Sequence, residues 1–298
     1  MCGIIAAASE RNVGKLLVKG LHKMEYRGYD SAGIALHQKD QIAHLRTLGK
    51  VKLLEEKMIS EKPKSKLGIA HTRWATHGEP SEENAHPHKS NERVYIVHNG
   101  IIENYIELKN FLKKEGYNFS SQTDSELIAH MIEYFLGQGN NMLDSMYLTK
   151  KKLDGAYAIA AIDKNDDKKI TIARSKSPLL IGIGKYGSLA ASDPLAISGL
   201  TNKFIFLEDG DVAEISSKEY KIYDDSKNEV QRDISQIDIS NEATSKGSYR
   251  HFMEKEIYEQ PDAILNTIDG RVGGDDVLDN IFGLGSSEVF AKVKRIQI

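Results

Sequence analysis

The sequence predicts an α+β sandwich, in which β-sheets pack against each other and helices lie outside them. Short apolar runs of strand length recur through the first hundred residues, and similar runs return between about residues 157 and 223. Two amphipathic helical patterns, at 103–114 and 125–136, lie between these two regions. Strands, a helical middle and further strands are typical of packed sheets with helices on their outer faces.

The individual elements follow from local patterns. Apolar or alternating runs bounded by turn residues predict strands, and apolar residues at helical spacing predict helices. The predicted strands are 2–8, 31–37, 41–48, 67–74, 94–98, 157–162, 169–173, 179–183, 204–207, 212–215 and 221–223. The predicted helices are 13–24, 51–59, 103–114, 125–136 and 251–268, the last interrupted or bent at Pro261.

The residue pattern of the chain changes from strand-like to loop-like near residue 240. The segment NEATSKGS (241–248) is typical of a loop, and a glycine-rich GRVGGDD (270–276) suggests a hinge. The final EVFAKVKRIQI looks like a helix end that enters a strand. We therefore predict one domain over 2–240, and over 241–298 a linker followed by the start of a second domain that is truncated.

Composition narrows the class of protein. The 298 residues are 40% hydrophobic, enough for a substantial core, and their formal net charge is −3. A nucleic-acid surface normally requires a basic excess, so we expect no nucleic-acid partner. No segment approaches the roughly 20 apolar residues of a membrane-spanning helix, so we expect no membrane partner. A single cysteine fits a reducing cytoplasm, where we place the protein.

That cysteine is the second residue of the chain. The small side chain of Cys2 favours removal of Met1, which would leave a thiol and a free α-amino group on one residue. A thiol reacts as its thiolate, and an α-amino group with a pKa of about 7.7–8.0 is able to accept its proton near pH 7. An isolated cysteine is also commonly a small buried hydrophobe. Both interpretations are open at this point.

A second group of polar residues occupies HTRWATHGEPSEENAHPH, residues 71–88. Arg73 stands at a predicted strand end, where a guanidinium is able to grip a carboxylate through two hydrogen bonds. The histidines of this segment are His71, His77, His86 and His88. Imidazole is a zinc ligand, but these spacings follow no zinc-finger or HExxH pattern, so we expect hydrogen bonding rather than a metal site.

Two further motifs have a simple structural interpretation and a chemical one. Asn99-Gly100 follows a predicted strand and suits a tight turn, or an oxyanion hole built from the Asn99 amide and the Gly100 N–H. Asp124 precedes a predicted helix and suits an N-cap, or a carboxylate that holds a substrate ammonium group. The residues alone do not decide between these interpretations.

Taken together, the motifs resemble the glutaminase domain, a class II glutamine amidotransferase domain, of the glutamine:fructose-6-phosphate aminotransferase family, also called glucosamine-6-phosphate synthases. The segments that carry the resemblance are CGI (2–4), MEYRGYDSAGIA (24–35), GIAHTRWATHGEPSEENAHPH (68–88), VHNGIIEN (97–104), QTDSE (122–126) and GAYAIA (155–160). A further segment, HFMEKEIYEQP (251–261), resembles that family's junction with its sugar-phosphate isomerase half. The resemblance implies an N-terminal-nucleophile hydrolase fold, a four-layer α/β/β/α sandwich.

The resemblance also implies roles for individual residues. Cys2 would attack the side-chain amide of L-glutamine and form a glutamyl thioester, with Asn99 and Gly100 as the oxyanion hole. Arg73 would bind the substrate carboxylate and Asp124 its ammonium group. The other implied site residues are Thr76 and His77 in a closing loop, Trp74 at the ammonia passage, and Arg27 and His86 nearby. The family needs neither cofactor nor metal for this reaction.

Several functional hypotheses remain to be separated. Fructose-6-phosphate would accept the ammonia only in the second domain, and the longer enzyme is a possible homodimer. Amidophosphoribosyltransferase, asparagine synthetase and glutamate synthase share the same N-terminal cysteine chemistry. From other classes, a non-catalytic amino-acid-binding module and a zinc hydrolase are the alternatives.

Overall fold

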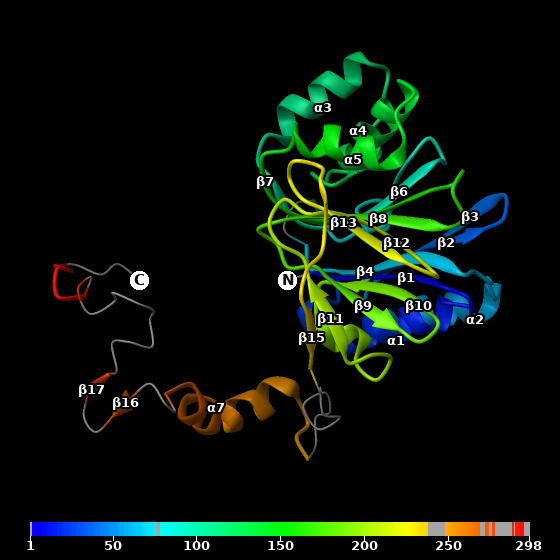
Figure 1. Cartoon of the computed structure of the whole chain (residues 1–298). Coiled ribbons are helices and arrows are strands. Elements are labelled where there is room, and N and C mark those ends of the chain that lie inside the picture. The colour runs from blue at the N-terminus through cyan, green and yellow to red at the C-terminus, as the bar shows by residue number, and fades with distance from the viewer. Residues whose placement is uncertain are drawn as a thin grey trace. The chain divides into compact units, whose positions relative to one another are not determined.

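The structure is a computed structural model of the chain, and it describes residues 2–75, 78–237, 248–268, 272–273, 276–277, 288 and 290–294. The chain divides into two compact units, Met1–Ser240 and Asn241–Ile298. Two antiparallel sheets lie face to face in the larger unit, as Figure 1 shows.

The first sheet has eight strands, and its central strand begins directly after Cys2. In spatial order its strands are β15 (Ile234–Gln236), β11 (Lys203–Phe206), β9 (Leu180–Gly184), β10 (Gly187–Ala191), β1 (Gly3–Ser9), β4 (Leu67–Arg73), β2 (Ser31–Gln38) and β3 (Gln41–Leu48). All neighbours are antiparallel. Because β1 is hydrogen-bonded to a strand on each side, the backbone next to Cys2 is held within the sheet.

The second sheet has seven strands and supplies the other wall of the sandwich. Its spatial order is β14 (Glu229–Val230), β13 (Tyr220–Tyr223), β12 (Val212–Ser216), β8 (Lys169–Ser175), β7 (Gly155–Asp163), β6 (Val94–Ile102) and β5 (His88–Ser90). These strands are also antiparallel to their neighbours. The long β6–β7 pair runs from Val94 opposite Asp163 to Ile102 opposite Gly155.

Helices cover the outer face of each sheet. Helices α1 (Gly14–Met24) and α2 (Val51–Glu61) pack on the first sheet, and α3 (Tyr105–Lys114), α4 (Glu126–Gly137) and α5 (Met142–Lys150) pack on the second. Two short 3₁₀ turns, η1 (Glu25–Arg27) and η2 (Pro194–Ile197), extend the first helical layer. The layers therefore follow the order α/β/β/α (Figure 1).

Strand β1 illustrates why the sequence folds in this way. Successive side chains of a strand point to opposite faces. Ile4 and Ala6 lie in the core between the two sheets, whereas Ile5 and Ala7 lie in the core beneath α1. Because both faces are covered, the strand is apolar throughout rather than alternating, and it is buried along its whole length.

The described elements correspond to the predicted ones with a few differences. Helix α5 and strands β5, β10, β14 and β15 are not among the predicted elements. Helix α7 (Phe252–Ile268) continues through Pro261 rather than being interrupted there. Within the predicted hinge, β16 (Val272–Gly273) pairs with β17 (Asp276–Val277). The predicted final strand lies largely outside the described residues.

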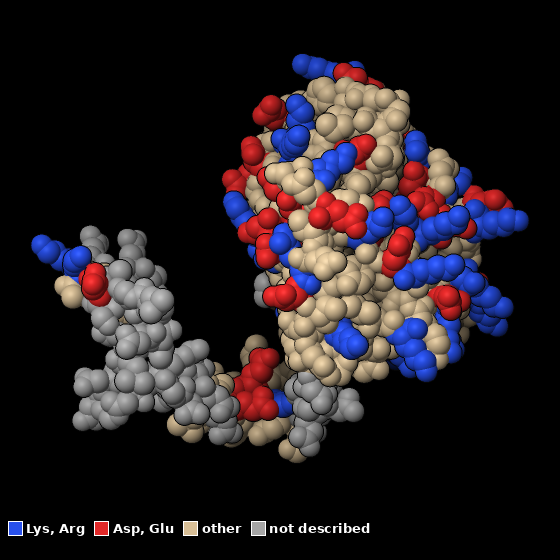
Figure 2. Space-filling model, viewed as in Figure 1, with Lys and Arg blue, Asp and Glu red and all other residues tan. Residues whose placement is uncertain are grey.

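Charged side chains of both signs are interspersed over the visible face of the larger unit, as Figure 2 shows. Basic side chains gather at its right margin, where Figure 1 places α2 and the β2–β3 hairpin. In the described part of the chain, no helix is long and apolar enough to cross a membrane.

Candidate active site

The thiol of Cys2 lies against the backbone of Trp74, which follows β4. The Trp74 N–H donates to Sγ over 3.3 Å, and Sγ lies 3.6 Å from the Trp74 carbonyl oxygen. Burial raises the pKa of the Cys2 thiol, and the hydrogen bond from the Trp74 backbone only partly opposes this effect. The thiol is therefore protonated near neutral pH and needs a base before it can attack.

The Asn99-Gly100 pair lies beside Cys2, at the end of β6. The Asn99 side-chain amide donates to the Cys2 carbonyl oxygen over 3.1 Å. Gly100 has a φ of +132°, and a Cβ there would lie 1.9 Å from the Ala156 carbonyl oxygen of the neighbouring strand. This position therefore requires glycine.

Arg73 and Asp124 are both buried close to the thiol. Arg73, the last residue of β4, donates to the carbonyl oxygens of Gly78 (3.2 Å) and Glu79 (3.4 Å). Asp124 accepts from the Ile102 N–H over 2.8 Å. Rather than an N-cap of α4, whose N-cap residue is Ser125, Asp124 is held by the backbone of the second sheet.

Most of these residues surround one crevice, and Asn99 adjoins it through Cys2 without being one of its lining residues. Its lining is Cys2, Arg73, Trp74, His86, His98, Gly100, Thr123, Asp124 and Ser125. The crevice holds about 20 Å³ of free volume, which is room for about one water molecule. The structure thus brings a thiol, a guanidinium and a carboxylate together around a narrow, polar space.

Of the other predicted site residues, Trp74 lines the crevice and Arg27 does not. Trp74 is 48% exposed, and its ring contacts the Tyr29 ring edge-on, with the ring centroids 5.9 Å apart. Arg27 is not among the lining residues and instead pairs with Asp193. Residues Thr76 and His77 lie outside the described part of the chain.

His86 is buried in the wall of the crevice, and neither of its ring nitrogens has a hydrogen-bond partner among the described residues. Its ring lies 4.1 Å from the His71 ring and 4.5 Å from the His88 ring, centroid to centroid. Burial holds the pKa of His86 well below its usual value, so the ring is neutral at pH 7. In the described part of the chain, no three or more His, Cys, Asp or Glu side chains are grouped to hold a metal ion.

Two residues near the thiol were not anticipated. The Asp30 carboxylate accepts a hydrogen bond from the Ala75 N–H and so anchors the segment that contacts Sγ. His71 contacts the Asn99 side chain; the sequence favoured hydrogen bonding over a metal site for the histidines of 71–88 but did not identify Asn99 as the partner. Strand alternation could have indicated His71, because it lies two residues before Arg73 and faces the same side of β4.

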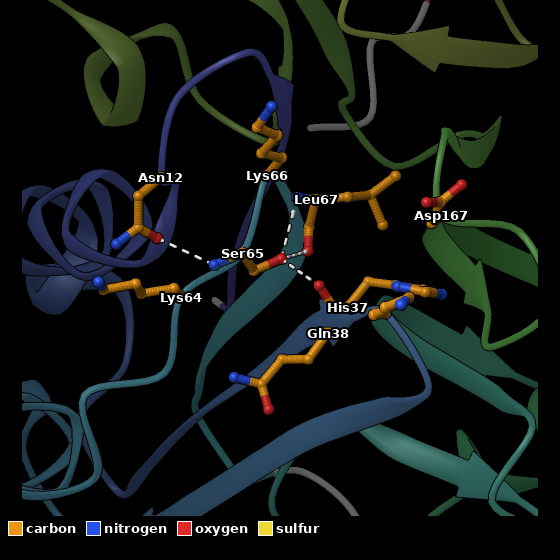
Figure 3. A pocket seen from close by; sticks show the side chains of 9 residues that line it. Asn12, His37, Gln38, Lys64, Ser65, Lys66, Leu67 and Asp167 are labelled. Atoms are coloured by element: carbon orange, nitrogen blue, oxygen red, sulfur yellow. Dashed lines mark hydrogen bonds between the residues drawn. The ribbon is translucent and has the colours of Figure 1, made fainter.

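A larger pocket of about 570 Å³ lies elsewhere, beyond the other end of β1 (Figure 3). Its buried polar groups already have partners within the protein. The Ser65 hydroxyl accepts from the Leu67 N–H (3.0 Å) and donates to the His37 carbonyl oxygen (2.6 Å). Asn12 accepts from the Ser65 N–H over 3.1 Å. None of the partnerless buried side-chain atoms found in the described residues belongs to a residue that lines this pocket.

Comparisons with known proteins show which families this chain resembles. Residues 71–198 match the family model described as "Glutamine amidotransferase domain". The whole chain is 47% identical to a glutamine--fructose-6-phosphate aminotransferase [isomerizing] of Vibrio vulnificus and 48% identical to that of Haemophilus influenzae. In both cases the chain spans about half of the relative's length, 49%.

A solved structure agrees as well. The glutamine phosphoribosylpyrophosphate amidotransferase of B. subtilis matches 76% of this chain and 50% of its own, with a TM-score of 0.66 and 25% sequence identity. The predicted N-terminal-nucleophile hydrolase fold is confirmed by this likeness and by the four layers.

The fold is thus that of an amidotransferase of the N-terminal-nucleophile class, and residues 71–198 match a glutamine amidotransferase domain. Within that class its sequence falls with the glutamine--fructose-6-phosphate aminotransferases, which it matches over its entire length. The resemblance found in the sequence is confirmed, and the higher identity favours this group over the phosphoribosylpyrophosphate enzymes.

Proposed function

We propose that the larger unit hydrolyses the side-chain amide of L-glutamine to glutamate and ammonia, with Cys2 as the nucleophile. The observation that carries this proposal is the crevice itself, in which Cys2, Arg73 and Asp124 lie together. A guanidinium and a carboxylate beside one thiol complement the two charged groups of an amino acid. With glutamine bound in this way, its side-chain amide lies next to the thiol of Cys2.

The reaction begins once Met1 is removed. The freed α-amino group of Cys2 takes the thiol proton, and the thiolate attacks the amide carbon of glutamine. The carbon–nitrogen bond breaks, the nitrogen takes up the proton, and ammonia leaves a glutamyl thioester on Sγ. Water then attacks the thioester, glutamate departs, and the thiol is restored.

The surrounding residues have distinct roles in this proposal. Asn99 and the Gly100 N–H stabilise the oxygen that becomes negative during each attack. Arg73 binds the α-carboxylate of glutamine and Asp124 its ammonium group. Trp74 borders the route by which ammonia leaves.

Four further residues have supporting roles in the proposal. Thr76 and His77 belong to a loop that closes over glutamine. Arg27 supports the entrance through its pair with Asp193, and His86 contributes to the crevice wall. Because the free volume suits only about one water molecule, glutamine binding widens the crevice.

The longer protein would use the ammonia to make an amino sugar. The relatives are named as aminotransferases that act on fructose-6-phosphate, and we assign fructose-6-phosphate as the acceptor in a domain that begins within residues 241–298. A homodimer of the longer enzyme and a cytoplasmic location remain predictions. The unit described here has glutamate and free ammonia as its products.

Product analysis of the purified chain tests the proposal. We expect equal amounts of glutamate and ammonia from L-glutamine, and no turnover after Cys2→Ala. Glutamine binding without any glutamate formation would instead indicate an amino-acid-binding module. Loss of activity on chelation, together with stoichiometric zinc, would indicate the zinc hydrolase.

A further inference from the structure

The side chain of His71 connects the two sheets directly behind the oxyanion residues. His71 lies on β4 in the first sheet and is 1% exposed. Its Nε2 lies 3.0 Å from the Asn99 side-chain oxygen and 3.1 Å from the His98 carbonyl oxygen. Both neighbours belong to β6 of the second sheet.

The surroundings of Nε2 determine which tautomer His71 adopts. Burial lowers the pKa of His71 to about 3, so the ring is neutral at pH 7 and carries one N–H. Both groups at Nε2 are oxygen acceptors, whereas Nδ1 has no partner among the described residues. The proton therefore lies on Nε2, where it is shared by two acceptors.

An Nε2–H donor fixes the orientation of the Asn99 amide. With the amide oxygen toward His71, the amide NH₂ faces Cys2 and donates to the Cys2 carbonyl oxygen. A flipped amide would place two donors together at His71 and two acceptors together at Cys2. Of the two N–H bonds of the NH₂ group, one is donated to Cys2. The other has no partner among the described residues, and we assign it to an oxygen atom of the substrate.

We propose that His71 is a positioning residue, which locks the Asn99 side chain as an oxyanion donor through its Nε2–H. The proposal rests on the proposed function, because it assigns His71 a part in the same amide hydrolysis. His71 does not act as a base in this arrangement: a neutral imidazole that gives its only N–H to two carbonyl oxygens holds the amide rather than taking a proton from the thiol.

Three substitutions of His71 separate positioning from packing. His71→Gln keeps a donor near the Nε2 position, whereas His71→Asn carries its amide nitrogen nearer the Nδ1 position and does not reach Asn99. His71→Leu removes the donor. Steady-state glutamine hydrolysis is measured for each variant, alone and combined with Asn99→Ala, and thermal unfolding confirms that each variant is folded.

We expect His71→Leu and His71→Asn to lower kcat by about tenfold to a hundredfold, with KM changed less than about threefold, because an oxyanion contact acts mainly in the transition state. His71→Gln restores at least half of the lost activity. In the Asn99→Ala background, His71→Leu has no further effect, since it acts through Asn99.

A second measurement determines the affinity for glutamate γ-semialdehyde, an aldehyde to which the Cys2 thiol adds. The addition forms a carbon–sulfur bond, and the former carbonyl oxygen then occupies the oxyanion position. His71→Leu weakens this adduct by about tenfold but leaves glutamate binding unchanged. Multiplicative losses in the double variant, or equal activity of His71→Gln and His71→Leu, would overturn the inference. Absence of hydrolysis by the unsubstituted chain would overturn the proposed function instead, so the two failures are distinguishable.

Discussion

The two ends of β1 present two very different hollows. Cys2 precedes the strand and Asn12 follows it, so the hollows are separated by about 23 Å of strand at about 3.3 Å per residue. The hollow beyond Asn12 is roomy, with about 570 Å³, whereas the crevice at Cys2 has about 20 Å³. Pocket volume alone would therefore place the active site at the Asn12 end of β1, away from Cys2.

What distinguishes the crevice is that it is lined by buried polar atoms without hydrogen-bond partners among the described residues. Both ring nitrogens of His86 and the Nε2 of His98 are buried without partners among the described residues, and both residues line the crevice. At the other end, Ser65 and His37 already bond to the protein. A buried polar group without a partner costs about 1–3 kcal/mol, so unpartnered groups beside a thiol indicate a site shaped for a ligand. The following predictions test this contrast.

The largest effect is expected at the thiol. Cys2→Ser keeps the size of the side chain but replaces the thiol with a hydroxyl, which ionises far less readily. We expect kcat for glutamine hydrolysis to fall by about a thousandfold or more, while glutamine binding, measured by calorimetry, is retained. A serine variant with wild-type kcat would remove Cys2 from the chemistry.

Substrate charge recognition comes next. Asp124→Asn keeps an oxygen to accept from the Ile102 N–H but loses the charge, and Asp167→Asn makes the same change at the rim of the larger pocket. We expect Asp124→Asn to raise KM for glutamine by about tenfold to a hundredfold, because a charged hydrogen bond is worth about 1.5–3 kcal/mol. The Asp167→Asn control keeps its KM. Equal effects of the two substitutions would contradict the assignment of the site.

The buried histidines near the crevice predict a dependence of stability on pH. The folded-state pKa of His71, about 3, lies below its ordinary value of 6.5, so between these values the unfolded chain binds a proton that the folded chain does not. The free energy of unfolding therefore falls as pH drops from about 6.5 toward 3, by about 1.4 kcal/mol per pH unit for one such histidine.

The substitution His71→Gln removes this contribution, because glutamine does not titrate. Urea unfolding between pH 4 and 6 is expected to show a slope of unfolding free energy against pH that is shallower by about one proton. His86 and His88, whose pKa values burial also lowers, preserve the remaining slope. Identical slopes for the two proteins would mean that His71 is protonated in the folded state.

The smallest effect on activity is expected at the larger pocket. Ser65→Ala leaves the His37 carbonyl oxygen and the Leu67 N–H without their hydroxyl partner. We expect the free energy of unfolding to fall by about 1–3 kcal/mol, with kcat and KM for glutamine unchanged. A change in KM would show that this end of β1 takes part in glutamine binding.

The sequence predicted the framework better than its details. The apolar run of β1 and the strand-length run of its neighbour β4 suffice to predict buried strands, whereas its other neighbour, β10, was not predicted. Helix α5 escaped prediction because the apolar residues of MLDSMYLTK form no single stripe, and its interior-facing side includes Ser145 and Thr149. Strand β5 has three residues, too few for a pattern to appear.

For the site, motifs placed the principal groups, but not the contacts between them. Cys2, Arg73 and Asp124 lie far apart in the chain, and only the pairing of β1 with β4 and the stacking of the sheets brings them to one crevice. The contact of His71 with Asn99 depends on the orientation of one amide between two sheets, which no local pattern encodes.

Mass analysis of the purified chain, before and after incubation with the glutamine-like electrophile 6-diazo-5-oxo-norleucine, tests the central claim most directly. We expect the mass of a protein without Met1, one adduct on the amino-terminal peptide at Cys2, and loss of glutaminase activity in proportion to the adduct. Retention of Met1 in active protein, or full activity in fully labelled protein, would contradict the assignment of Cys2 as the nucleophile.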